Sequence, residues 1–212
     1  AGDGKATESN YPYWEKAVPM LRKMDSSRLI SSADHGHRKT SRRERRPEDA
    51  DLFDESDIRF ENWTAGHPAS FYDLFDVLSG NVYVSQVGDG TVAYHKYAGM
   101  LKHLNKPLVV SEFGSMSVRD EGGLVPGDKL GAEARHEVIL REAYQSFHEL
   151  PEIVGWTPWC LMDVRVPMHW RWYNRGKGVF RYGLMNEAWE PKRAFAVVKE
   201  EIARLRARYR DE

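Results

Sequence analysis

The sequence predicts an α/β fold in which strands alternate with helices and pair into a parallel sheet. Its clearest strand is Leu108–Ser111, an uncharged apolar run between Pro107 and Gly114, as is typical of a buried strand in a parallel sheet. Three more strands are expected, near Leu29–Ser32, Asn81–Ser85 and Val154–Trp159. The segments after the strands are much longer than the helix-to-strand connections, and in a (β/α)8 barrel such elaboration lies on the catalytic face.

Length and composition indicate one domain that spans residues 1–212. The chain is 41% hydrophobic and 30% charged, enough to bury a sizeable core. Its net charge of -1 gives no general attraction to nucleic acid or to anionic membranes, so neither is expected as a partner. The single cysteine, Cys160, excludes an internal disulfide and leaves the compartment open. The first ten residues lack the apolar core of a signal peptide, and no run of about 18 apolar residues is present to span a bilayer.

The first third of the chain predicts one helix, one strand and a long polar segment. Asn10 is expected to cap the helix, and Pro19 to kink or restart it. One face of this helix collects the apolar side chains Trp14, Ala17, Val18 and Leu21. A strand is expected within Arg28–Ala33, followed by Asp34–Pro68, whose basic and then acidic blocks are typical of a solvated loop.

The rest of the chain repeats strand, loop and helix. The expected elements are a short helix at Phe71–Asp76, a strand at Asn81–Ser85, a helix capped by Thr91, a strand that ends at Glu112, a helix at Ala132–His148, a strand at Ile153–Cys160, a loop at Met162–Trp189 and a last helix opened by Pro191. The expected inward faces are Tyr94, Tyr97, Ala98, Leu101 and Leu104; Ile139, Leu140, Ala143, Tyr144 and Phe147; and Ala194, Val198, Ile202 and Leu205.

Glu112 is the residue that most strongly indicates chemistry. It lies at the carboxyl end of the clearest strand, where a carboxylate is rare unless it is paired or used. In a (β/α)8 barrel this end is where catalytic groups collect. Glu112 is therefore a candidate nucleophile or base, and the alternative is a strand-end glutamate held by a neighbouring arginine.

Four segments together resemble one family of enzymes. KPLVVSEFGS, Lys106–Ser115, resembles the nucleophile strand of glycoside hydrolase family 2, which contains the β-glucuronidases and β-galactosidases. MDSSRLISSA, Met24–Ala33, resembles the approach to the fifth barrel strand, and DVLSGNVYVS, Asp76–Ser85, resembles the sixth. IVGWTPWCLMDV, Ile153–Val164, resembles the eighth, and RGKGVF followed by EPK, which ends at Lys192, resembles the segment that leads into the last helix. The resemblance implies the second half of a TIM barrel, strands 5–8.

This resemblance implies a retaining glycoside hydrolase that acts on β-glycosidic bonds. Glu112 matches the nucleophile, Tyr83 the tyrosine that contacts it, Trp159 the tryptophan under the bound sugar, and Asp163 a nearby aspartate that contacts substrate. A retaining enzyme needs two carboxyl groups roughly 5 Å apart. The family's acid/base, a glutamate after an asparagine, ends the fourth strand, which this chain lacks. The partner expected besides a carbohydrate substrate is therefore the missing N-terminal barrel half, in the same polypeptide or in another chain. The pair Asn186–Glu187 lies in the wrong place for this role and is interpreted as chance.

The remaining candidates are substrate contacts. They are His35, Asn81, Asn174 and Lys177. Asn174 and Lys177 resemble the Asn-x-Lys pair with which β-glucuronidases bind the sugar carboxylate, although they are spaced one residue further apart. His35 and His37 form a pair that can also bind a metal in barrel hydrolases. We expect no metal and no cofactor, and two alternatives stay open: a carbohydrate-binding remnant without turnover, and a metal-dependent amidohydrolase-like barrel.

Overall fold

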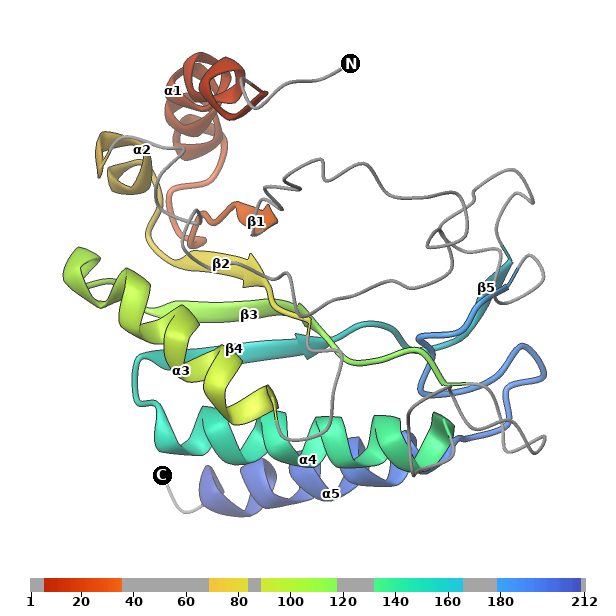
Figure 1. Cartoon of the computed structure of the whole chain (residues 1–212). Coiled ribbons are helices and arrows are strands. Elements are labelled where there is room, and N and C mark those ends of the chain that lie inside the picture. Colours follow the sequence, from red (N-terminus) through yellow and green to blue (C-terminus); the bar gives the residue numbers. More distant parts are fainter. Residues whose placement is uncertain (1–5, 36–68, 84–88, 118–131, 166–178, 211–212) are drawn as a thin grey trace, which may run out of the picture.

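A four-stranded parallel sheet with helices packed on one face forms the centre of the molecule (Figure 1). The computed structural model describes residues 6–35, 69–83, 89–117, 132–165 and 179–210. Its elements are α1 (Ala6–Met24), β1 (Ala33–His35), α2 (Ala69–Asp73), β2 (Leu78–Asn81), α3 (Asp89–Leu101), the 3-10 helix η4 (Lys102–Leu104), β3 (Leu108–Phe113), α4 (Ala132–Glu149), β4 (Ile153–Pro158), β5 (Val164–Arg165), β6 (Val179–Phe180) and α5 (Arg193–Arg208). The α/β class predicted from the sequence is confirmed.

The sheet has the order β1-β2-β3-β4, and every neighbouring pair is parallel. All four strands therefore end at the same edge, which lies to the right in Figure 1. Between β2 and β3 the pairing is regular from Leu78 to Gly80, and the register shifts between Gly80 and Asn81. Between β3 and β4 the register shifts between Leu108 and Val109 and again between Val110 and Phe113.

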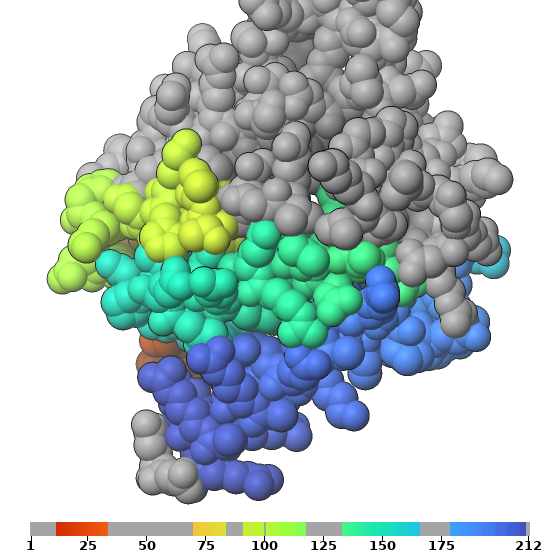
Figure 2. Space-filling model, turned by 60° about the horizontal axis from the view of Figure 1, so that its bottom comes forward, coloured from red at the N-terminus to blue at the C-terminus, as the bar shows by residue number. Residues whose placement is uncertain are grey.

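The core lies between the sheet and a layer of three helices. Helices α3, α4 and α5 lie side by side, with α4 in the middle (Figure 2). Leu108 and Val110 of β3 are buried in this core, whereas Val109 between them is only half-buried on the opposite face. The predicted inward residues of α3 and α4 are buried, namely Tyr94, Tyr97, Ala98, Leu101, Ile139, Leu140, Ala143, Tyr144 and Phe147. The helical period of the sequence thus predicted correctly which faces pack on the sheet.

The first strand lies later in the chain than predicted. The sequence predicted a strand at Leu29–Ser32, but β1 is Ala33–His35. The backbone of Ile30 pairs with Asp76 instead of with a strand: its N–H donates to Asp76 Oδ2 at 2.7 Å, and its carbonyl accepts from the Asp76 N–H at 3.0 Å. The guanidinium of Arg22 binds the same carboxylate and lowers its pKa, mainly through this hydrogen bond. Asp76 therefore fixes the approach to β1.

The second strand lies earlier than predicted. The sequence predicted Asn81–Ser85, but β2 is Leu78–Asn81. The strand begins where the Leu78 N–H donates to the Pro107 carbonyl at 3.0 Å, directly before the Leu78–Leu108 pair. Pairing with β3 thus sets the bounds of β2. The short sequence LSGN carries no alternating pattern from which the strand could have been predicted.

Four helices also differ from their predictions. Helix α2 is Ala69–Asp73 where Phe71–Asp76 was predicted. Helix α1 begins at Ala6, so Asn10 lies inside it, and it continues through Pro19 without a break. Helix α3 begins at Asp89, so Thr91 lies in its first turn and not at its cap. In α5 the predicted inward residue Ile202 is 45% exposed, whereas Glu201 is buried. The carboxylate of Glu201 lies 2.8 Å from Nε2 of His148 on α4, and the buried positions of α5 are Ala194, Val197 and Glu201.

The segment predicted as a loop after β4 contains a second, small sheet. Strands β5 and β6 pair antiparallel, with Val164 opposite Phe180 and Arg165 opposite Val179.

Among the described residues, no helix is long and apolar enough to cross a lipid bilayer.

Candidate functional site

A hydrogen bond between Tyr83 and Glu112 marks the carboxyl end of the sheet. The Tyr83 hydroxyl donates to Oε2 of Glu112 at 2.6 Å. Glu112 is the penultimate residue of β3, and Tyr83 comes two residues after the end of β2. The Val82 N–H donates to the Glu112 carbonyl at 2.8 Å, which carries the pairing of the two strands up to the site. The contact predicted between Tyr83 and Glu112 is therefore present, while their roles in a reaction stay predictions.

Tyr83 can act only as a donor in this contact. Burial, followed by the hydrogen bond to Glu112, raises the pKa of the Tyr83 hydroxyl far above its ordinary value. The phenol therefore stays protonated, and Glu112 is held as the acceptor. The ring of Tyr83 packs edge-on against Tyr182, with centroids 5.6 Å apart, and Tyr182 stacks on Phe180 at 4.5 Å. The small sheet thus supports the tyrosine from the side.

Trp159 lies directly after β4, at the same edge of the sheet. The backbone N–H of Trp159 donates to the Phe113 carbonyl at 2.9 Å, and the residue is 41% exposed. The peptide bond from Trp159 to Cys160 is cis. Gly114 has a φ of +135, and a Cβ on it would lie 3.0 Å from the Trp159 carbonyl oxygen, so only glycine fits this close approach. Glu112, Tyr83 and Trp159 thus come from the ends of three neighbouring strands.

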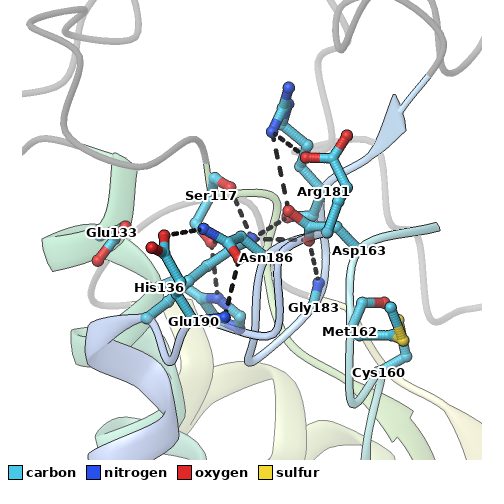
Figure 3. Close-up of polar contacts among 12 residues, drawn as sticks. Ser117, Glu133, His136, Cys160, Met162, Asp163, Arg181, Gly183, Asn186 and Glu190 are labelled. Atoms are coloured by element: carbon cyan, nitrogen blue, oxygen red, sulfur yellow. Dashed lines mark hydrogen bonds and ion pairs between the residues drawn. The ribbon is translucent and has the colours of Figure 1, made fainter. Parts of the chain in front are cut away.

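The structure buries Asp163 in an ion pair that the sequence did not predict. The Asp163 side chain, labelled in Figure 3, has no exposed surface and is bonded to Lys192 Nζ at 2.7 Å. The Gly183 N–H donates to the same oxygen at 2.8 Å, and Arg181 lies 3.8 Å from the other. Burial raises the pKa of Asp163 and lowers that of Lys192, while their mutual contact opposes both shifts. Asp163 is therefore buried beside Lys192, and its contact with substrate stays a prediction.

A buried polar cluster surrounds this ion pair. Lys192 also donates to the Ser117 carbonyl at 3.0 Å and lies 3.3 Å from the Ser117 hydroxyl, which in turn lies 3.2 Å from Nδ1 of His136. Burial, and then the charges of Lys192 and Arg135, lower the pKa of His136 from 6.5 to about 3, so its ring is neutral. No site role was predicted for these residues. The one available signal was Lys192 itself, since a lysine just before a helix opposes the helix dipole and needs a partner.

Of the remaining predicted substrate contacts, only Asn81 has a side chain that the structure describes. Asn81 is 8% exposed, and its Oδ1 accepts a hydrogen bond from the Ser111 hydroxyl at 2.7 Å. Asn81 lies opposite Glu112 in the pairing of β2 with β3. The side chain of His35 and all of Asn174 and Lys177 lie outside the described residues. Within the described part of the chain, no three side chains of metal-binding type are grouped.

Comparison with known proteins identifies fold relatives. No protein-family model and no curated protein sequence matches the chain. A glycoside hydrolase family 2 β-galacturonidase from Eisenbergiella tayi, bound to galacturonate, is similar with a TM-score of 0.65 and 19% identity, over 90% of this chain and 30% of that one. A β-D-glucuronidase of Dictyoglomus thermophilum gives 0.64 and 15%, over 90% and 28%. A Ruminococcus gnavus β-glucuronidase gives 0.62 and 17%, over 90% and 29%. The chain thus spans less than a third of these relatives, and at such low identity the likeness shows the fold alone.

Replacing Gly183 with alanine should destabilise the fold strongly. A Cβ at Gly183 would lie 2.2 Å from the Asp163 nitrogen and 2.4 Å from the Met185 oxygen, and backbone atoms cannot move away cheaply. We expect Gly183→Ala to lower the free energy of unfolding by about 3 kcal/mol, at the upper end for overpacking. Urea unfolding followed by circular dichroism measures this. The matched control is Gly99→Ala, which meets nothing within 4 Å and should stabilise α3 by about 0.5–1 kcal/mol. Equal midpoints for the two variants would contradict the packing.

His136 should make the fold sensitive to mild acid. Because its pKa is about 3 in the folded state and 6.5 when unfolded, the unfolded chain binds the extra proton, so stability falls as pH drops below 6.5. When the pH is lowered from about 8 to about 5, His136 alone should lower the free energy of unfolding by about 2 kcal/mol. Comparing urea unfolding of the wild type and His136→Gln at both pH values isolates this effect, since other groups titrate in both proteins. The exposed His103→Gln should retain the full dependence, and an unchanged slope in His136→Gln would refute the assignment.

Proposed function

We propose that this chain is the second half, strands 5–8, of the TIM barrel of a retaining glycoside hydrolase that acts on β-glycosidic bonds. The observation that carries the proposal is the 2.6 Å hydrogen bond from Tyr83 to Glu112 at the carboxyl end of a parallel sheet. The fold likeness to β-glucuronidases and a β-galacturonidase supports it, as do the sequence segments that resemble glycoside hydrolase family 2.

In the proposed mechanism Glu112 is the nucleophile. Its ionised carboxylate attacks the anomeric carbon, so that a bond forms to Glu112 while the bond to the leaving oxygen breaks and that oxygen takes a proton from an acid. Water then hydrolyses the glycosyl-enzyme and releases Glu112. Tyr83 holds the attacking carboxylate in one orientation by its hydrogen bond. Trp159, with a partly exposed ring at the same edge, offers an apolar surface on which a sugar ring can stack.

The proposed partner is the other half of the barrel, which supplies the acid/base carboxyl group. Within the described residues β1 pairs only with β2 and β4 only with β3, so both outer edges of the sheet offer backbone groups for further pairing. Leu29, on the segment before β1, is 73% exposed, and Val154 on β4 is 60% exposed. Both fit an interface at these edges. Without the acid/base, glycosides with unactivated leaving groups should react about 10²–10⁴-fold more slowly.

The proposed substrates are β-linked uronides. The basis is that the structural neighbours are named as β-glucuronidases and as a β-galacturonidase bound to galacturonate. In this proposal Asn174 and Lys177 contact the sugar carboxylate, and His35 contacts a hydroxyl group. No metal or cofactor takes part.

Covalent trapping should label Glu112. The reagents are a fluorinated dinitrophenyl β-glucuronide and its galacturonide counterpart. Their dinitrophenyl leaving group needs no proton, and the fluorine on the sugar slows hydrolysis of the glycosyl-enzyme. We expect mass spectrometry of the treated chain to show one added sugar on the peptide that contains Glu112. Glu112→Gln should take up none, whereas Glu187→Gln, whose carboxylate pairs with Arg181 at 3.3 Å, should be labelled normally. A label on another carboxylate would refute the nucleophile, and sugar binding without any label would favour the non-hydrolytic alternative.

Removing the Tyr83 hydroxyl should slow catalysis without weakening substrate binding. A hydrogen bond to a charged group contributes about 1.5–3 kcal/mol, which corresponds to about a 10–100-fold loss in kcat on an activated aryl glycoside for Tyr83→Phe. KM should change little, because the hydroxyl contacts Glu112. Tyr94→Phe is the matched control, since its buried hydroxyl bonds the Val82 carbonyl at 3.4 Å. Equal kinetics for the two variants would remove Tyr83 from the mechanism.

A further inference from the structure

Lys192 joins three chain segments that follow β3, β4 and β6. Its side chain is 2% exposed and lies directly before α5. The ammonium donates to the Ser117 carbonyl at 3.0 Å, to Asp163 Oδ1 at 2.7 Å and to the Arg181 carbonyl at 3.5 Å, and Figure 3 labels these three partners. These three acceptors belong to the segment after β3, the segment after β4 and the segment after β6. One buried cation therefore fixes three chain segments relative to one another.

Each of these segments is connected to a residue of the proposed active site. Ser117 lies on the segment that follows β3, and β3 contains Glu112. Asp163 lies on the segment after β4, and that segment begins with Trp159. Arg181 precedes Tyr182, whose ring packs against Tyr83.

Backbone hydrogen bonds link the same segments directly. The Ser117 N–H donates to the Arg181 carbonyl at 2.8 Å, and the Cys160 N–H donates to the Tyr182 carbonyl at 3.2 Å. A displacement at Lys192 would therefore be transmitted to Glu112, Tyr83 and Trp159.

The charge arrangement favours a role in geometry over a role in stability. A buried ion pair often contributes no more stability than apolar side chains of the same volume, because both charges must be taken out of water. Lys192 also lies at the end of α5 where the helix dipole disfavours a cation. The neighbouring ring of His136 is neutral and so adds no further positive charge to the cluster. What the ammonium supplies, and an apolar side chain cannot, is three simultaneous directional hydrogen bonds.

We propose that Lys192 and Asp163 are positioning residues, whose ion pair holds in place the segments that adjoin Glu112, Trp159 and, through the ring of Tyr182, Tyr83. The inference rests on the proposed function for the role of that site. Its test, however, measures geometry and needs no turnover.

The test follows Tyr83 and the nearby methionines by NMR. Tyrosine labelled at its ζ carbon reports ionisation of the phenol, and Tyr83→Phe assigns the signal. In the wild type the Tyr83 signal should stay in the protonated position until the chain unfolds in alkali, because burial and Glu112 raise its pKa. In Lys192→Met we expect it to titrate near the ordinary tyrosine value of about 10. The labelled methyl groups of Met116 and Met162, which lie on the joined segments, should shift, whereas those of Met20 and Met24 on α1 should not.

Three further variants keep the test decisive. Removing one charge from a buried pair can unfold a protein, so Asp163→Asn combined with Lys192→Met removes both charges and should fold yet show the same changes. Lys192→Arg keeps the charge and should retain the wild-type Tyr83 signal. Glu201→Gln breaks the buried pair between α5 and His148, and it should lower stability without moving Tyr83, Met116 or Met162.

The outcomes separate the two claims. Unchanged Tyr83 and methionine signals in the folded double variant, or equal changes in Glu201→Gln, would overturn the positioning role. If these signals move as expected while Glu112 takes up no label from the fluorinated glycosides, the proposed function fails and the positioning role stands.

Discussion

The parallel pairing of β2, β3 and β4 is the constraint on which the rest of the structure depends. Parallel neighbours need a crossover between them, so each strand is followed by a segment that returns over the same face, and α3 and α4 fill that layer. The same pairing brings all carboxyl ends to one edge. The register shifts near Asn81 and Phe113 lie at this edge, beside Tyr83 and Glu112. The site is therefore built where the regular ladder ends.

Much of this arrangement could be predicted from the sequence because its signals are local. The run Leu108–Ser111 and the inward stripes of α3 and α4 repeat at the periods that strands and helices require, so their positions were predicted to within a few residues. Strands β1 and β2 could not be located in this way. They are three and four residues long, and pairing with a neighbour determines their bounds. For the same reason the contact between Tyr83 and Glu112 was predicted from a family resemblance, since 29 residues separate them in the sequence.

Buried charges account for what the sequence did not reveal near the site and in the last helix. Asp163 was predicted to contact substrate from the family resemblance, and Ile202 was predicted to lie in the core because an aliphatic side chain is expected inside. In the structure Asp163 has Lys192 as its partner and Glu201 has His148, so both carboxylates are buried while Ile202 is exposed. A sequence shows the type of each residue but not its partner across the fold. Partners decide whether burying a charge is tolerable.

On the proposed function, closing the sheet and completing the chemistry are one requirement. The face of the sheet opposite the helices is only half-buried at Ser79, Val109, Ser111 and Gly155. In a closed barrel such a face is filled by side chains from strands on the other side. A retaining mechanism also needs its second carboxyl group roughly 5 Å from the nucleophile, and therefore across the mouth from Glu112. In the proposed barrel, the parallel strands that cover the half-buried face also bring their carboxyl ends to that mouth. The partner that would bury this face is thus also placed to supply the acid/base.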